Sequence, residues 1–338
     1  MQARENLAQQ AAKGAADALI PQSNDKTKWW QQITEYSLIV IFVVMFVTMS
    51  LTVDHFFSIE NMLGLALSIS QIGMVSCTMM FCLASRDFDL SVGSTVAFAG
   101  VLCAMVLNAT GNTFIAIIAA VAAGSVIGFI NGAVIAYLRI NALITTLATM
   151  EIVRGFGFIV SHGQAVGVSS DTFIALGGLS FFGVSLPIWV TLLCFIVFGV
   201  MLNKTVYGRN TLAIGGNPEA SRLAGINVER TRVYIFLVQG AVTALAGVIL
   251  ASRITSGQPN AAEGFELNVI SACVLGGVSL LGGRATISGV VIGVLIMGTV
   301  ENVMNLMNID AFYQYLVRGA ILLAAVLLDQ LKNRGSRD

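Results

Sequence analysis

Long apolar stretches, separated by short polar connections, alternate along most of the chain. Each stretch has approximately the length of a transmembrane helix, about 20 residues. The ten stretches cover approximately residues 36–53, 62–84, 90–107, 114–138, 144–160, 186–202, 233–251, 267–280, 288–304 and 312–329. The third and the eighth are weak or short, so eight or nine full crossings remain an alternative. The pattern predicts an all-α integral membrane protein with about ten transmembrane helices, some of them short or broken.

The positions of the basic residues predict how such a chain is oriented. With ten crossings and a cytoplasmic N-terminus, the cytoplasmic segments hold all 18 lysines and arginines except Arg154, Arg253 and Arg318, and of these three only Arg253 lies in an outer loop. Basic residues favour the cytoplasmic side, and losing one crossing would reverse every later loop. Both termini are therefore expected in the cytoplasm. The predicted parts are an N-terminal tail at 1–30, a transmembrane permease domain at 31–332 and a C-terminal tail at 333–338.

Composition supports a membrane protein and argues against several kinds of chemistry. Hydrophobic residues make up 56% of the chain and charged residues 11%, against about 25% charged in soluble domains. The five cysteines lie inside apolar stretches without metal-ligand spacing, which indicates packing residues. The two histidines are isolated in polar connections, so neither a metal site nor histidine-based catalysis is expected.

The most informative polar connection is the segment 203–232, which is expected in the cytoplasm. Asn217 is a good N-cap and Pro218 is favoured at the first helical position, while Gly225 supplies a stop. These residues predict a helix of about two turns at 218–224. So short a helix is marginal in isolation and needs a surface to pack against. The alternative is a connection whose arginines serve only to orient the chain.

Several motifs make the chain resemble bacterial ABC importer permeases for monosaccharides. They are AIGGNPEASRLAGINVERTR in the segment 203–232, FDLSVGS at 88–94, NALITTLATMEIVRG at 141–155, SRITSGQP at 252–259 and VLGGVSLLGG at 274–283. The similarity extends from about residue 36 to residue 330. Within this family the motifs are most similar to those of L-arabinose permeases, with other pentoses or hexoses as alternatives. Arg86 departs from the pattern, because a glycine is expected there, and this puts the local turn in doubt.

The resemblance implies a division of labour among several proteins. Two permease chains form the pathway as a homodimer, cytoplasmic ABC ATPase subunits hydrolyse ATP, and a periplasmic sugar-binding protein delivers the substrate. The short helix would then sit in a groove of the ATPase. The resemblance assigns this coupling role to Gly215, Gly216, Asn217, Pro218, Glu219, Ala220, Arg222, Leu223 and Gly225. The sequence has no GxxxxGK[ST] loop, so no cofactor is expected on this chain and ATP would be bound by the partner subunit.

Polar residues within the apolar stretches are candidates for the translocation pathway, because such residues usually face a cavity or another helix. Asparagine, glutamine and threonine offer the neutral donors and acceptors that a sugar needs. The candidates are Gln71, Asn141, Thr145, Thr149, Asn302 and Asn305. For each residue the alternative is a hydrogen bond that holds two helices together. Glu301 and Arg318 are candidates for an ion pair within the membrane.

Other spacings predict close packing and possible duplication. Gly124, Gly128 and Gly132 form two successive GxxxG spacings, which predict a close helix contact either within the chain or between chains. The connections at 85–91 and 276–283 both follow a cysteine-containing apolar stretch, which suggests an internal repeat. Asp87 and Asp89 are interpreted as the start of a capped helix rather than as a catalytic pair.

A secondary transporter coupled to an ion gradient is the alternative from a different class. Such transporters often place acidic residues in mid-membrane. Glu301 is the only clear carboxylate within a predicted span, which argues against proton coupling.

Overall fold

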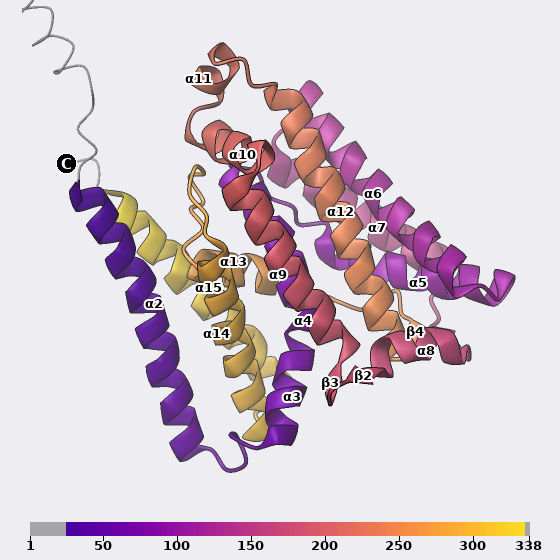
Figure 1. Ribbon diagram of the computed structural model, residues 1–338. Coiled ribbons are helices and arrows are strands. Elements are labelled where there is room, and N and C mark those ends of the chain that lie inside the picture. Colours follow the sequence, from indigo (N-terminus) through magenta and orange to yellow (C-terminus); the bar gives the residue numbers. More distant parts are fainter. Residues whose placement is uncertain (1–24, 335–338) are drawn as a thin grey trace, which may run out of the picture. The chain divides into compact units, whose positions relative to one another are not determined.

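The computed structural model describes residues 25–334 and consists almost entirely of helices (Figure 1). The helices are α2 (Asp25–Thr52), α3 (Ile59–Ser68), α4 (Ser70–Ala84), α5 (Val92–Thr110), α6 (Thr113–Tyr137), α7 (Ala142–Val160), α8 (Asp171–Gly178), α9 (Leu186–Lys204), α10 (Val206–Gly216), α11 (Pro218–Leu223), α12 (Val228–Arg253), α13 (Phe265–Leu275), α14 (Ile287–Leu306) and α15 (Ala311–Arg334). The chain divides into two compact units at residues 41 and 42. The description below concerns the larger unit, from Phe42 onwards.

The described residues also include four strands of two residues each, which form two small antiparallel ladders. β1 (Val166–Gly167) pairs with β4 (Ser256–Gly257), and β2 (Ser180–Phe181) pairs with β3 (Val184–Ser185). The apolar pattern did not predict these ladders, because each lies within a polar connection. The predicted tails lie mostly outside the described residues; within the described part, residues 25–30 belong to α2 and residues 333 and 334 to α15.

Six helices of the described residues are long and apolar enough to cross a membrane: α5, α6, α7, α9, α12 and α14. A seventh crossing is possible if α3 and α4, which are bent by 40° at Ile69, form one span. Three shorter apolar helices lie at Leu38–Thr52, Phe265–Leu275 and Ala311–Leu327. Each predicted stretch therefore contains a helix or a bent pair of helices, and the chain is a multi-pass membrane protein.

Two predicted spans differ from the observed helices. The stretch 62–84 is not continuous, because α3 ends at Ser68 and α4 begins at Ser70. The stretch 267–280 is too long, because α13 ends at Leu275 and residues 276–286 form turns. The second difference has a local cause, because glycine disfavours a helix. The residues after α13 include glycines at 276, 277, 282 and 283. Apolar composition alone could not locate either boundary.

The helix α4 lies at the centre of the larger unit. Every residue of α4 is buried, and α9, α12, α13 and α14 all pack against it. Its side chains Met74, Met79 and Phe81 belong to the main hydrophobic cluster. A helix that is apolar on all sides is expected in such a position.

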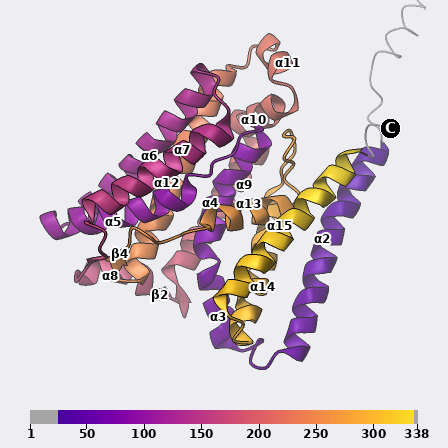
Figure 2. The same ribbon diagram turned by 180° about the vertical axis from the view of Figure 1, so that it is seen from behind.

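The GxxxG glycines of α6 contact α12 of the same chain, which decides between the two partners that the sequence left open. A Cβ added at Gly128 would overlap the Phe236 carbonyl oxygen, and one added at Gly240 would overlap that of Gly124. The two backbones therefore touch without side chains between them. Figure 2 shows α6 and α12 side by side from the opposite direction.

The helices α4 and α13 end in the same way. The Asp87 amide donates to the Cys82 carbonyl oxygen at 2.9 Å, and the Val278 amide donates to the Cys273 carbonyl oxygen at 3.0 Å. The residue before each donor is left-handed: Arg86 with φ 69° and Gly277 with φ 81°. Both ends are Schellman motifs. The same motif also ends α7, α11 and α14, so it is not specific to these two connections, and the internal repeat stays a prediction.

Candidate functional site

The segment 203–232 folds into α10, α11 and the start of α12. Asn217 accepts hydrogen bonds from the amides of Glu219 and Ala220, both at 3.0 Å, and so caps α11. Gly225 has a φ of 85°, in the left-handed region where glycine is favoured. The predicted short helix is confirmed, with its observed end at Leu223.

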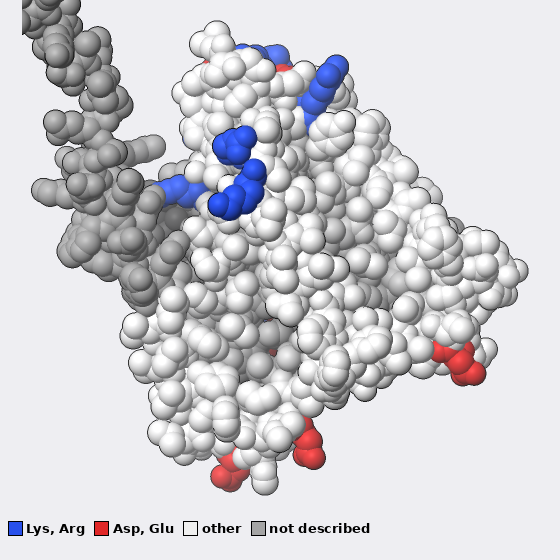
Figure 3. Space-filling model, viewed as in Figure 1, with Lys and Arg blue, Asp and Glu red and all other residues white. Residues whose placement is uncertain are grey.

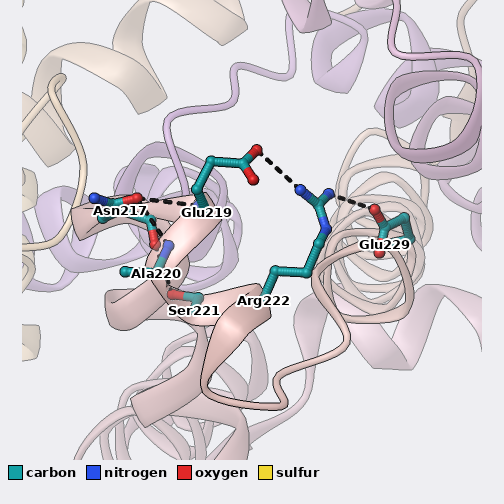
Figure 4. A network of polar contacts seen from close by, with 6 residues as sticks. All are labelled: Asn217, Glu219, Ala220, Ser221, Arg222 and Glu229. Carbon is teal, nitrogen blue, oxygen red and sulfur yellow. Dashed lines mark hydrogen bonds and ion pairs between the residues drawn. The ribbon is translucent and has the colours of Figure 1, made fainter.

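A charged network fixes α11 to the first turn of α12 (Figure 4). The Arg222 guanidinium donates to Glu219 at 3.0 Å and to Glu229 at 2.5 Å. A single exposed ion pair contributes little to stability. Here one arginine bridges two elements, so the pairs define the orientation of a helix that is too short to be stable alone.

The outer side of α11 is exposed at one end of the larger unit. Leu223 is 91% exposed, and Ala220 and Ala224 are also exposed. Lys and Arg side chains gather on this end, around α10 and α11, with some acidic side chains beside them, and further acidic side chains of the same face lie at the opposite end (Figure 3). Leu223 is therefore a large apolar side chain exposed on a charged surface.

Arg86 joins the end of α4 to the end of α10. Its Nε donates to the Gly215 carbonyl oxygen at 2.5 Å and its Nη2 to that of Gly216 at 2.7 Å. A cation at a helix C-terminus complements the helix dipole and satisfies free carbonyl groups. The turn itself is retained, because Arg86 adopts the left-handed conformation for which glycine was expected. The unexpected residue therefore adds a contact without changing the backbone.

Three distant motifs meet at Gly215. A Cβ there would overlap the Ala84 carbonyl oxygen and approach the Gly283 amide, and that amide donates to Ala84 at 2.9 Å. The end of α4, the end of α10 and the glycine-rich turn after α13 thus form one junction, called here the Gly215 junction. By contrast, an added Cβ at Gly216 would contact nothing within 4 Å.

A polar cavity of about 480 Å³ lies among α11, the connection after α4, the connection between α6 and α7, and the start of α12; the pathway candidate Asn141 lines it. Arg232 lines it and pairs with the buried Asp87, with 3.1 Å between Nε and Oδ2. Burial raises the pKa of Asp87 from 3.8 to about 6, although Arg232 and a hydrogen bond from Ser85 lower it. The pair joins the connection after α4 to the first turns of α12.

Asp89 starts a chain of buried hydrogen bonds that ends on α7. Its Oδ1 accepts from the Ser91 amide at 3.0 Å and from the Ser91 hydroxyl at 2.6 Å. The Asn131 amide donates to the Ser91 hydroxyl oxygen, and the Thr149 hydroxyl donates to Asn131. Asp89 lies just before α5, as predicted, but the predicted cap is wrong, because the N-cap residue is Ser91 and its side chain makes no capping hydrogen bond. Burial raises the pKa of Asp89 to about 6, while both bonds from Ser91 lower it.

Each residue named for the pathway has a partner within the chain. The Arg253 guanidinium donates to Gln71 at 2.8 Å. Asn141 caps α7 and its carbonyl oxygen accepts from Thr145. The remaining pairs are Thr149 with Asn131, Asn302 with Asn61 and Asn305 with Gln314. These bonds connect helices or helix turns, as in the alternative interpretation.

The predicted ion pair within the membrane is confirmed. Arg318 Nε lies 3.1 Å from Glu301 Oε1 and joins α15 to α14. Asn268 on α13 donates to the same Glu301 oxygen at 3.1 Å. The cysteines of the described residues are free and buried, in agreement with their interpretation as packing residues.

Sequence reasoning missed the buried polar groups that lack a partner. Gln239 and Thr243 on α12 are 0% exposed, and none of their side-chain polar atoms has a hydrogen-bond partner in the described chain. A single polar residue in an apolar stretch gives no sign of whether it will be paired, because pairing depends on distant helices.

Comparison with known proteins identifies the family. Residues 61–326 match the family described as "Branched-chain amino acid transport system / permease component". The chain is 57% identical over 308 residues to the L-arabinose transport system permease protein AraH of Escherichia coli, covering 91% of this chain and 93% of the relative. It is 51% identical over 328 residues to the L-arabinose ABC transporter permease protein AraH of Azospirillum brasilense, covering 97% of each.

More distant relatives include ribose permeases. The ribose import permease protein RbsC of Escherichia coli is 35% identical over 310 residues, covering 90% of this chain and 96% of the relative. No solved structure matches the chain. The family match and the alignments with these relatives cover most of the sequence. They include the connection after α4, the turn after α13 and the segment around α11. The chain therefore belongs to the permease-component family of branched-chain amino acid transport systems.

Proposed function

We propose that the chain is the membrane-spanning subunit of an ATP-binding-cassette importer for L-arabinose in the bacterial inner membrane. The observation that carries this proposal is the 57% identity to an L-arabinose permease over nine-tenths of the chain, compared with 35% to a ribose permease. Other pentoses and hexoses are the alternative substrates.

The proposed topology has ten crossings and cytoplasmic termini. The ten are the six long helices, the bent pair and the three shorter apolar helices. In this topology the exposed end of α11 faces the cytoplasm, where the basic residues belong. The Arg253 guanidinium, at the other end of α12, then lies on the outer side and reaches Gln71 and the Leu67 carbonyl at the break between α3 and α4.

The proposed partners are cytoplasmic ABC ATPase subunits, a periplasmic sugar-binding protein and a second permease chain. ATP is bound and hydrolysed by the ATPase, since the permease sequence has no phosphate-binding loop. Residues 215–225 transmit movement of the ATPase to the membrane helices. The exposed Leu223 supports this role, because docking of a partner on α11 would remove its apolar surface from water.

The test is reconstitution of the permease with its ATPase and binding protein in proteoliposomes. Sugar uptake should require ATP, and it should persist when ionophores collapse the ion gradients. Leu223→Asp should prevent co-purification with the ATPase. The matched control is Leu138→Asp, since Leu138 is 67% exposed at the end of α6 and outside residues 215–225.

Two outcomes would contradict the proposal. Uptake that follows an ion gradient without ATP would identify a secondary transporter instead. Normal assembly and ATP-driven uptake after deletion of residues 217–225 would remove the coupling role of α11. A tenfold excess of ribose or galactose should compete poorly with labelled L-arabinose; equal competition would remove the assignment of the sugar.

A further inference from the structure

The carboxylate of Glu151 lies in the middle of the membrane-spanning helix α7. Glu151 is equally far from Ala142 and Val160, the two ends of the helix, and a rise of 1.5 Å per residue places it about 14 Å from each of them. Its side chain is exposed. Among the six long helices of the described residues, Glu151 is the only charged side chain that is exposed and lies more than one turn from a helix end.

This position corrects one expectation from the sequence. Glu301 was expected to be the only clear carboxylate within a span, and that expectation is wrong, because Glu151 is a second. The two differ in their surroundings: Glu301 is paired with Arg318, whereas Glu151 forms no ion pair within the described chain. The choice of ATP over an ion gradient therefore depends on the relatives and not on a lack of carboxylates.

The other polar side chains of α7 lie on the opposite side of the helix. Thr145 is buried, and Thr149 donates to Asn131 on α6. With 3.6 residues per turn, Glu151 points about 160° away from Thr149. Glu151 shares its side of α7 with exposed apolar side chains, which are Ile144, Leu147 and Phe158. It therefore projects away from its own chain, out of an apolar face.

The positions one turn before and one turn after Glu151 carry small residues. Ala148 lies three residues before it and Gly155 four residues after it, so both are its neighbours on the helix surface. A Cβ added at Gly155 would meet nothing within 4 Å. The carboxylate is therefore accessible to a ligand from outside the chain.

An exposed carboxylate at this depth can face lipid, a cation of a second copy, or water. Lipid is unfavourable, because charged side chains within a membrane almost always face a cavity or a partner. Three arginines lie in or at the end of the described membrane-spanning helices: Arg154, Arg253 and Arg318. Each already has partners in its own chain, which are two carbonyl oxygens for Arg154, a glutamine for Arg253 and a glutamate for Arg318. A second copy therefore offers no spare cation here, and water remains.

The contacts of Arg154 argue against a purely structural role for Glu151. Arg154 follows Glu151 by three residues and is close enough to attract it electrostatically. Its Nη1 nevertheless donates to the carbonyl oxygens of Pro259, at 2.8 Å, and Ala261, at 2.7 Å. Arg154 is thus held by the connection before α13, and the Glu151 carboxylate stays available to a ligand.

We infer that Glu151 of each permease chain lines the pathway between two copies and accepts hydrogen bonds from the hydroxyl groups of the passing sugar. This inference rests on the proposed function and names a residue that contacts its substrate. An ionised carboxylate is purely an acceptor, and its hydrogen bonds are stronger than those between neutral groups. It suits a neutral polyhydroxyl compound and repels a sugar that carries a phosphate or a carboxylate. The apolar face around it adds few polar contacts, so the sugar is not held tightly.

Uptake measurements distinguish a sugar contact from a side chain that faces lipid. Glu151→Leu should lower ATP-driven L-arabinose uptake by about tenfold, the loss expected for one hydrogen bond to a charged group. The complex should assemble and should melt at or above the temperature of the parent, because no contact within the chain is lost. Glu151→Gln keeps one acceptor oxygen and should retain more uptake than Glu151→Leu. If Glu151 faced lipid, Glu151→Leu would transport normally.

Cysteine labelling gives a second measurement that does not depend on uptake. In a transport-active background without the five native cysteines, Glu151→Cys should react with a water-soluble thiosulfonate, since the reacting thiolate forms in water. L-Arabinose should slow the reaction during ATP turnover. The matched control is Ile196→Cys, at a position that is 57% exposed near the middle of α9; it should stay unlabelled, because an apolar exposed face in mid-membrane contacts lipid or another chain. Equal labelling of the two positions would overturn the inference.

The outcomes separate this inference from the proposed function. If the parent complex moves no sugar, the proposed function fails. If the parent transports L-arabinose and Glu151→Leu transports it equally well, the assignment of Glu151 fails and the proposed function stands. A Glu151→Leu complex that melts at a lower temperature would also overturn the assignment, because it would show that Glu151 stabilises the assembly.

Discussion

The Gly215 junction and the surroundings of α4 differ in whether their polar groups have hydrogen-bond or ion-pair partners. At the junction and around α11, Arg86, Asp87, Asn217 and Arg222 all have partners at short distances. Around α4, buried glutamine, serine and threonine atoms have none. Full pairing stabilises one geometry, whereas a buried group without a partner contributes no such stabilisation. The comparison predicts that substitutions at the junction cost more stability than substitutions of the unpaired groups around α4.

The largest expected effect comes from breaking the buried pair at the junction. Arg232→Met leaves the Asp87 carboxylate, which is 6% exposed, without its cation, and should lower the free energy of unfolding by about 3–5 kcal/mol. Thermal unfolding in detergent at pH 7.5 measures the effect. The loss should shrink at pH 5, because without Arg232 the Asp87 pKa rises further and the side chain becomes neutral. Arg230→Met, at an exposed position two residues earlier, is the control; equal losses would contradict a special role for the pair.

The second prediction concerns how the stability of the fold depends on pH through the buried Asp89. Its pKa is about 6 in the fold and about 3.9 in the unfolded chain, so the folded protein binds the proton more tightly. This group's stabilising contribution is fully present below pH 4 and is lost as pH rises through 6, an effect of up to about 3 kcal/mol. Asp89→Asn keeps the acceptor for Ser91 and should flatten the dependence of unfolding temperature on pH. An unchanged pH profile would place the dependence on another group.

Two adjacent glycines test how tightly the junction is packed. Gly215→Ala should lower the free energy of unfolding by about 1–3 kcal/mol, because the new methyl group meets the Ala84 backbone. It should also reduce ATP-driven uptake if the junction carries movement from α11. Gly216→Ala meets nothing within 4 Å and should behave like the parent. Similar results for the two variants would show that the backbone at the junction shifts to accommodate an added methyl group at little cost.

The smallest expected effect concerns the cap of α11. Asn217→Ala removes the acceptor for two amides and should cost about 1 kcal/mol of local stability. Hydrogen exchange of the Glu219 and Ala220 amides should become faster, and ATPase binding should weaken. Asn217→Asp preserves the acceptor and should retain slow exchange. If Asn217→Ala left exchange unchanged, α11 would be held by the Arg222 network alone.

Local signals in the sequence were sufficient to predict some features. The ends of α11 follow from Asn217, Pro218 and Gly225, because capping depends on adjacent residues. The pair of Glu301 and Arg318 was predictable because two charges in adjacent apolar stretches need each other in lipid.

Features that depend on distant contacts were not predictable. The glycine spacing of α6 predicted a close contact but not that α12 makes it. The role of Arg86 depends on Gly215 at the end of α10, 129 residues further along the chain. The break at Ile69 has no glycine or proline to signal it. The unpaired state of Gln239 is a property of four packed helices, and no local pattern records it.

The direct backbone contact between α6 and α12 has a mechanical consequence. Two helices whose glycines interlock cannot slide past each other without a steric clash, so they turn together as one lever. One end of that lever is attached to α11 through Gly225 and the Arg222 bridge, and its middle carries Gln239. If a partner displaces α11, we therefore expect α6 to move together with α12, because no side chains lie between the two backbones at these glycines.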